Sequence, residues 1–421
     1  MKVYAEERKS SPRFGIDDLT PRDAGPLAMP ADVHDVFQPE TKKLTEAEIL
    51  YLLARDFGHI GGLWSDSGEF IGSLEDAPDV GGSSTSFIYF VKNNKGDRIL
   101  VVKGIFEDND IELGRLEANN RNHLLANIPM GPGYPIVTVP EKLYRFQLKP
   151  INMGGVMISS GDIDLAILNA AHGESLSSMI KPKDASARLG MGELLKIMFS
   201  VGRALGLLNL HLAGLRPGAP FALLNPRLKF IHEDLHMSNI MITRRPGSRS
   251  LHGEPNDHSY KVWLIDTESF ATPEADSWYR NRRTGHVDRV KGQFERLYGM
   301  AMFGHDNFGG YDVREIKTLV VDGLITGYAT VFEHPQPAVR ELIEAVLSVN
   351  ELYLEIQDGG TPGATPAEEH LYLFMKKHHK KDVQEGPNRR DFLQKVIALN
   401  QLLQESLRQR TLLHHGGATT P

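Results

Sequence analysis

The hydrophobic pattern of the chain changes its period near Gly173, and this change most constrains the fold. Between Glu69 and Ile105, short alternating or apolar runs are separated by Gly, Ser, Asn and Asp, which is typical of strands in an antiparallel sheet. Beyond Gly173, apolar residues recur mainly at helical spacing. The sequence therefore predicts an α+β chain with two lobes, the first strand-rich and the second mainly helical.

The same patterns predict individual elements and domain limits. The expected strands are residues 86–91, 98–106, 134–139 and 164–168. The expected helices are residues 47–54, 111–127, 191–213, 339–354 and 390–413. We therefore expect a partly disordered N-terminal extension (1–67), a strand-rich lobe (68–168), a helical lobe (169–413) and a flexible tail (414–421).

Composition excludes several classes of protein. Lys and Arg number 47 and Asp and Glu number 54, a formal charge of −7, and such a chain is not expected to bind nucleic acid nonspecifically. No cysteine is present, which excludes disulfides, thiolate-bound zinc, iron–sulfur clusters and cysteine nucleophiles.

Targeting signals are weak. Residues 1–12 lack the apolar core of a secretory signal, and the most apolar stretch, 194–215, is interrupted by charged and polar residues. We expect no membrane span and a cytoplasmic location, and the long extension is also compatible with delivery into another cell as an effector.

The most informative segment consists of two apolar runs, residues 240–242 and 262–265, which a polar insertion connects. They predict a hairpin with a long loop. Asp234 precedes the first run, Asn239 opens it, and Asp266 ends the second, so three oxygen-bearing side chains can converge at one end of the hairpin. Carboxylate and amide oxygens suit Mg²⁺, a hard cation that takes few protein carboxylates together with phosphate oxygens.

This segment resembles the protein-kinase-like superfamily, most closely its aminoglycoside phosphotransferase and choline kinase branch. The pattern H-x-D-L-H-x-x-N is met by His232, Asp234, Leu235, His236 and Asn239, and Asp266 stands at the D-F-G position. The resemblance implies a bilobal fold and ATP- and Mg²⁺-dependent transfer of the γ-phosphoryl group to a hydroxyl. Thr267 stands where the small-molecule kinases often carry Trp, and the D-F-G motif itself is absent.

The resemblance also implies a role for each residue of the segment. Asp234 would orient the acceptor hydroxyl, and Asn239 and Asp266 would hold Mg²⁺ against the phosphates. His232 would fix the loop, and His236 would hydrogen-bond nearby backbone.

Upstream features follow in the order that the resemblance requires. The turn Gly81, Gly82, Ser83 and Ser84 would cover the phosphates, and Lys103 would reach the α- and β-phosphates. Glu117, with Glu112 as the second choice, would pair with Lys103. Ile167 and Asn169 would belong to the hinge that binds adenine.

The acceptor is less defined by the sequence. A small hydroxyl-bearing molecule is favoured by the branch that the motif resembles, and a protein Ser/Thr kinase is the nearest alternative. The segment 278–296 is net basic, which favours an anionic acceptor or a protein surface over a cationic amine. Its basic residues are Arg280, Arg282, Arg283, Arg289, Lys291 and Arg296.

Two further alternatives remain open. His232, Glu233 and His236 satisfy H-E-x-x-H, the zinc metalloprotease signature, for which Glu254 or Glu268 would be the third ligand. That reading needs both histidines on one face of a long helix, whereas this segment runs directly into an apolar strand. A kinase fold that binds without catalysis is the other alternative, because fold is inferred more securely than activity.

Overall fold

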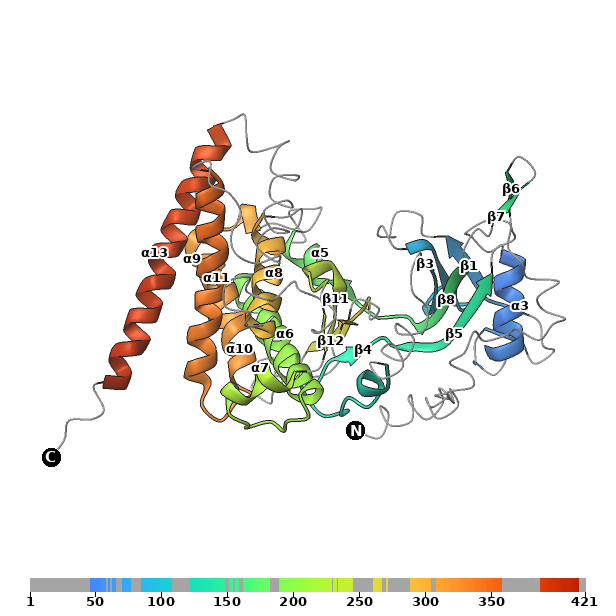
Figure 1. Ribbon diagram of the computed structural model, residues 1–421, viewed down its shortest axis with the longest axis horizontal. Coiled ribbons are helices and arrows are strands. Elements are labelled where there is room, and N and C mark those ends of the chain that lie inside the picture. The colour runs from blue at the N-terminus through green and yellow to red at the C-terminus, as the bar shows by residue number, and fades with distance from the viewer. Residues whose placement is uncertain are drawn as a thin grey trace. The chain divides into compact units, whose positions relative to one another are not determined.

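A computed structural model of the chain is shown in Figure 1. The residues that the structure describes are 46–57, 60, 63–65, 70–76, 85–107, 122–147, 151–153, 156–158, 162–181, 189–228, 230–232, 234–244, 260–266, 270–271, 288–303, 308–357 and 387–415. They contain both helices and antiparallel strands, so the fold is α+β. The chain divides into two compact units, of which unit 1 comprises 1–126 and 138–170, and unit 2 comprises 127–137 and 171–421.

Unit 1 contains an antiparallel sheet with the strand order β1-β2-β3-β8-β5 among the described residues. The strands are β1 (Ser73–Asp76), β2 (Thr85–Lys92), β3 (Arg98–Glu107), β5 (Pro140–Gln147) and β8 (Asp162–Asn169). The turn between β2 and β3 forms because the Asn93 side chain accepts hydrogen bonds from the backbone N–H groups of Lys95 and Asp97, at 2.9 and 2.8 Å. Gly96 has a φ of +83° there, which glycine adopts without strain. Three strands expected from the sequence, those around 86–91, 98–106 and 164–168, are confirmed.

Helix α3 (Glu46–Phe57) packs against this sheet. Its buried residues, Ile49, Leu52, Leu53 and Phe57, recur at helical spacing and join the core made by β2, β3 and β8. The Tyr144 hydroxyl on β5 donates a short hydrogen bond to Asp56, which ties the end of the helix to the edge of the sheet. The helix that the sequence placed in an N-terminal extension is thus part of the hydrophobic core of unit 1. Residues 1–45 lie outside the described residues.

Two elements expected from the sequence before Gly173 differ in the structure. The strand expected at 134–139 is reduced to β4 (Ile136–Val137), and it pairs in parallel with β12 of unit 2 instead of joining the sheet of unit 1. Pro135 directly before it lacks a backbone N–H. Of the helix expected at 111–127, residues 122–126 are helical and residues 111–121 lie outside the described part of the chain. A small hairpin, β6 (Ile151–Met153) and β7 (Val156–Ile158), completes the described strands of unit 1.

The described strands of unit 2 include a sheet with the order β4-β12-β11-β9. The hairpin expected from the two apolar runs is confirmed as β11 (Ile240–Arg244) and β12 (Tyr260–Leu264), antiparallel, with Ile240 opposite Leu264. Strand β9 (Glu174–Ser175) pairs with β11 on its other side. Gly173 precedes it with a φ of +100°, and a Cβ there would lie 2.0 Å from the Ile242 carbonyl oxygen, so only glycine fits. Strand β10 (Ile231–His232) pairs with β13 (Phe270–Ala271) in a separate ladder.

Helices make up most of the described part of unit 2 (Figure 1). The longer ones are α6 (Met191–Leu212), α8 (Arg289–Phe303), α11 (Pro335–Gln357) and α13 (Pro387–His415). The shorter ones are α5 (Leu176–Ile180), η3 (Phe221–Leu223), α7 (Leu224–Arg227), η4 (Met237–Asn239), η6 (Phe308–Gly310), α9 (Val313–Lys317), the π-helix η7 (Thr318–Ile325) and α10 (Thr326–Ala329). The helices expected at 191–213, 339–354 and 390–413 are confirmed. Among the described helices, none has a stretch both apolar enough and long enough to cross a bilayer.

The core of unit 2 depends on a close crossing of α6 with η7 and α10. Gly202 of α6 and Gly327 of α10 face backbone at the crossing, because a Cβ on Gly202 would lie 1.9 Å from the Leu324 carbonyl oxygen and one on Gly327 would lie 2.1 Å from that of Phe199. The two helical segments therefore approach at a distance that only glycine allows.

Helix α13 lies beside α11 (Figure 1), and a buried polar network connects them to α8. The Tyr298 hydroxyl donates to Asn350 Oδ1 at 2.8 Å, and Asn350 Nδ2 donates to Asn400 Oδ1 at 2.7 Å. All three side chains are buried, and Phe303 stacks on Tyr353 beside them at 4.6 Å between ring centroids. Buried amides need such partners, so the network selects the register in which the three helices pack.

Candidate active site

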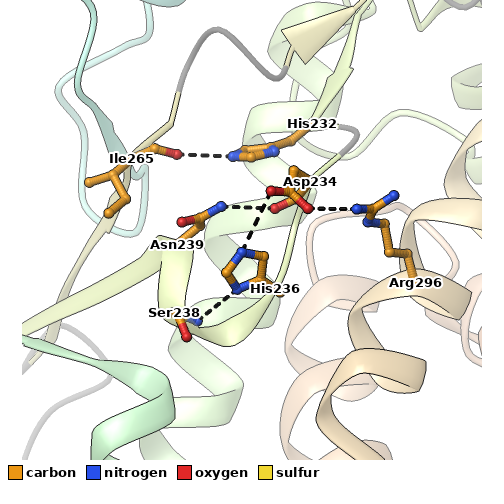
Figure 2. A network of polar contacts seen from close by, with 7 residues as sticks. All are labelled: His232, Asp234, His236, Ser238, Asn239, Ile265 and Arg296. Carbon is orange, nitrogen blue, oxygen red and sulfur yellow. Dashed lines mark hydrogen bonds and ion pairs between the residues drawn. The ribbon is translucent and has the colours of Figure 1, made fainter. Parts of the chain in front are cut away.

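The candidate active site is built on the loop between β10 and β11 and on the residues that follow β12 (Figure 2). The loop contains Asp234 and the 3₁₀ turn η4, which His236 caps by accepting a hydrogen bond from the Ser238 backbone N–H at 3.3 Å. The backbone contact expected for His236 is therefore confirmed. Because its Nδ1 is the acceptor, the proton of the neutral ring is on Nε2. All these residues belong to unit 2.

His232 connects the loop to the exit of β12. Its side chain is fully buried, and Nε2 donates to the Ile265 carbonyl oxygen at 3.0 Å. Burial lowers the pKa of His232 to about 4, although the hydrogen bond to Ile265 and the negative charges of Asp266 and Asp234 act in the opposite direction. The ring is therefore neutral at neutral pH. It holds backbone in place and is poorly suited to exchange protons there.

The Asp234 carboxylate is partly exposed on the loop. Its side chain is 40% exposed, and Oδ1 accepts a hydrogen bond from Arg296 Nη2 at 2.6 Å. On the other side, His236 Nε2 lies 3.7 Å from Oδ2. The polar contact with His236 and then the charge of Arg296 hold the pKa of Asp234 well below its usual range, against the opposing effect of partial burial. The carboxylate is ionised at neutral pH, with one oxygen fixed by a guanidinium.

Asn239 is held by both its side chain and its backbone. Its Nδ2 donates to the Asp234 carbonyl oxygen at 3.0 Å, and its own carbonyl accepts from the Ile265 N–H at 3.1 Å. The first bond uses the amide nitrogen, so the amide oxygen is the group that Asn239 can offer to a cation. Together with the bond from His232, the bond between Asn239 and Ile265 joins the loop to the end of β12.

Asp266 adopts a left-handed backbone conformation, with a φ of +65°. It is the one non-glycine residue with positive φ in the described part of the chain. Such a conformation costs about 1–3 kcal/mol and is concentrated at functional sites. Because both polar backbone groups of Ile265 are bonded to the loop, the position of the next residue, Asp266, is determined by the loop.

Four of the residues expected from the sequence, His232, Asp234, Asn239 and Asp266, are thus linked within unit 2. Lys103, Ile167 and Asn169 belong to unit 1. Lys103 lies in β3, opposite Ile88 of β2 and Ala166 of β8. Gly81, Gly82, Ser83, Ser84 and Glu117 lie outside the described residues, as do Glu112 and Glu233.

The two hinge residues have structural partners in unit 1. The Ile167 side chain is completely buried in the core between the sheet and α3, so its side chain contributes packing. Asn169 Nδ2 donates a short hydrogen bond to Glu141 on β5. Any contact that Ile167 makes with a nucleotide would therefore have to use backbone groups.

No protein-family model and no curated protein matches this sequence. A functional assignment therefore depends on the site residues and their geometry.

Arg296 is the site residue whose contact the sequence did not indicate. It was expected only as one of several basic residues facing an acceptor, and the structure pairs it with Asp234. Arg289 and Lys291 of the same segment also have partners within the protein, namely the Asn225 and Leu228 carbonyls and Glu295. Arg280, Arg282 and Arg283 lie outside the described residues. Arg289 and Arg296, seven residues apart, share one face of α8, but that spacing does not indicate which partner the face meets.

The described residues contain no cluster of three or more His, Asp or Glu that could hold a metal ion. Asn239 and Asp266 instead offer one amide oxygen and one carboxylate, a small set of hard donors. Such a set fits Mg²⁺, which usually keeps several waters and is completed by phosphate oxygens. It does not fit a structural zinc site, which requires four protein ligands.

Proposed function

We propose that the chain is an ATP- and Mg²⁺-dependent phosphotransferase that moves the γ-phosphoryl group to a hydroxyl acceptor. The observation that carries the proposal is the pair of hydrogen bonds at Ile265. Through them, His232 and Asn239 connect the loop of Asp234 to the residue before Asp266. A carboxylate for the acceptor and an amide and a carboxylate for Mg²⁺ are the protein groups that this chemistry needs around the transferred phosphate.

The architecture supports the same proposal. An antiparallel sheet in unit 1 and a mainly helical unit 2 that carries the loop and hairpin agree with a bilobal protein-kinase-like fold. The resemblance would assign Lys103, Gly81, Gly82, Ser83 and Ser84 to the phosphates and Glu117 to an ion pair with Lys103. Of these residues, Lys103 alone lies in the described part of the chain. Backbone groups near Ile167 and Asn169 bind adenine.

In the reaction, the acceptor oxygen forms a bond to the γ-phosphorus while the bond from that phosphorus to the β,γ-bridging oxygen breaks and ADP leaves. Asp234 accepts a hydrogen bond from the acceptor hydroxyl, orients its oxygen, and receives the proton as transfer proceeds. Asn239 and Asp266 would hold Mg²⁺, which would supply positive charge to the phosphate oxygens. His232 remains neutral and preserves the geometry of both segments.

A small hydroxyl-bearing molecule is the favoured acceptor, and a protein serine or threonine is the alternative. The described basic residues of α8 are engaged within the protein, so they give no support to a broad cationic surface for an acidic partner. Labelling with γ-phosphate-labelled ATP in a cell extract separates the two acceptors. Label in small metabolites supports the first, and label in protein bands supports the second.

The zinc protease alternative has less support from the backbone. His232 lies in β10 and is bonded to Ile265, while His236 caps a 3₁₀ turn. The two rings therefore do not share the helical face that an H-E-x-x-H site requires.

Thermal unfolding of the metal-stripped protein tests the proposal. Mg²⁺ with ATP at about 100 times the dissociation constant should stabilise the chain by about 2.7 kcal/mol. The shift should disappear in Asp266→Asn and persist in Asp322→Asn, a matched change at a carboxylate that pairs with Lys317 outside the site. Asp234→Asn should keep the shift and lose nearly all turnover, leaving a small residual rate. Stabilisation by Zn²⁺ without any response to Mg²⁺ and ATP would overturn the proposal in favour of the metalloprotease.

A further inference from the structure

The contact between Arg296 and Asp234 joins residues 62 positions apart and connects α8 to the candidate site (Figure 2). The Arg296 side chain is 20% exposed, whereas that of Asp234 is 40% exposed. One carboxylate oxygen, Oδ1, receives the guanidinium at 2.6 Å. The other, Oδ2, has His236 Nε2 at 3.7 Å, beyond ordinary hydrogen-bonding distance.

Helix α8, which carries this guanidinium, is packed into unit 2 and anchored at its first residue. Its buried residues, among them Phe294, Leu297 and Tyr298, fix the helix in the core of unit 2. At its start, Arg289 Nη1 donates to the carbonyls of Asn225 and Leu228, at 3.2 and 3.0 Å, and its backbone N–H donates to Asn225 Oδ1 at 2.8 Å. Arg289 and Arg296 are seven residues apart, about 10 Å along one helix face. The helix thus contacts the chain before the loop through Arg289 and the loop itself through Arg296.

We propose that Arg296 is a positioning residue for phosphoryl transfer, which holds Asp234 by Oδ1 so that Oδ2 is directed to the acceptor hydroxyl. This inference rests on the proposed function. A carboxylate on a half-exposed loop can rotate about its side-chain torsions, and transfer needs one oxygen at hydrogen-bonding distance from the hydroxyl. A planar guanidinium fixed by a packed helix removes that freedom, and a lysine ammonium does so less well because it is a point charge on a flexible stem.

The test uses the full chain with Mg²⁺, ATP and water as the acceptor, with ADP formation as the measurement. Arg296→Met keeps the aliphatic stem and removes the charge, and it should lower kcat about 10²-fold while the KM for Mg-ATP stays within about twofold. Arg296→Lys should recover part of the loss. Lys317→Met, the matched change at a lysine that pairs with Asp322 outside the site, should leave kcat unchanged.

A double-variant cycle separates positioning from a purely structural role. Because Arg296 acts through Asp234, adding Arg296→Met to Asp234→Asn should cause no further loss. Multiplicative losses, or wild-type kcat in folded Arg296→Met, would overturn the positioning role. If Arg296→Met does not unfold cooperatively, Arg296→Gln replaces it in the same cycle. A wild-type chain that forms no ADP would instead overturn the proposed function, so the two failures are distinct.

Discussion

Ile265 and Asn239 are joined by a backbone hydrogen bond of 3.1 Å, in which the N–H of Ile265 donates to the carbonyl of Asn239. The carbonyl of the same isoleucine accepts from His232 at 3.0 Å. Both polar backbone groups of one residue are therefore committed to the loop that carries Asp234. The position of Asp266, the next residue, depends on these two bonds.

The pH dependence of stability should report the buried imidazole. His232 has an ordinary pKa of 6.5 when unfolded and a pKa of about 4 when folded, so the unfolded state binds the proton more tightly. Its contribution is complete above pH 6.5, is lost as the pH falls toward 4, and amounts to roughly 3 kcal/mol. Urea unfolding between pH 4 and 7 should show this slope in the wild type and a shallower one in His232→Gln. Equal slopes would contradict a neutral buried ring.

Substitutions at Asp266 should separate backbone strain from metal binding. The φ of +65° suits glycine and is unfavourable for alanine, so Asp266→Gly should be about 1 kcal/mol more stable than Asp266→Ala. Both variants lack the carboxylate and should lose stabilisation by Mg²⁺ and ATP. Chemical denaturation with and without ligand measures both effects. An alanine variant as stable as the glycine variant would argue against strain at this residue.

The crossing of α6 with η7 and α10 should not tolerate a single methyl group. Gly202→Ala places a Cβ 1.9 Å from the Leu324 carbonyl oxygen, so the helices must separate, at a cost of about 3 kcal/mol or more. Gly192→Ala on the same helix meets nothing within 4 Å and should be neutral or stabilising by up to about 1 kcal/mol. Thermal unfolding of the pair provides the comparison. Similar midpoints for the two variants would contradict the close approach.

The buried amide of Asn350 should be required for docking of α13. Asn350→Leu leaves the Tyr298 hydroxyl and the Asn400 amide without this partner, and should cost about 2–4 kcal/mol. Tyr298→Phe removes a single bond and should cost about 1 kcal/mol. Urea denaturation of both variants and of their combination would show whether the losses are non-additive, as expected for one network. Full additivity would contradict the network.

Local patterns were sufficient for much of the fold. The hairpin of β11 and β12 was predicted because two short apolar runs are bounded by polar, turn-forming residues, and α6 was predicted from its long apolar periodicity. The sequence also indicated which polar residues stand at the ends of that hairpin, because they directly border the two apolar runs. Strand 134–139 was predicted too long and assigned to the first lobe, because its pairing with β12 is a long-range contact that local hydrophobicity does not encode.

Helix α3 shows the same limit. Its amphipathic pattern was visible, but its partner was not, since Ile49 and Phe57 are buried by β2, β3 and β8, which come much later in the chain. The roles proposed for Gly81 and Glu117 remain predictions, because both lie outside the described residues.

The sequence by itself determined the helices and strands with strong periodicity, and the identity of the polar residues that border one hairpin, because both depend on near neighbours. Tertiary structure decided which of those residues meet. His232 and Ile265 are 33 positions apart, and Asp234 and Arg296 are 62 apart. The first contact exists because β10 and the end of β12 are brought together in unit 2, where His232 is fully buried. The second exists because α8 is packed into the core of unit 2 and anchored by Arg289, so both contacts depend on burial among residues far apart in sequence.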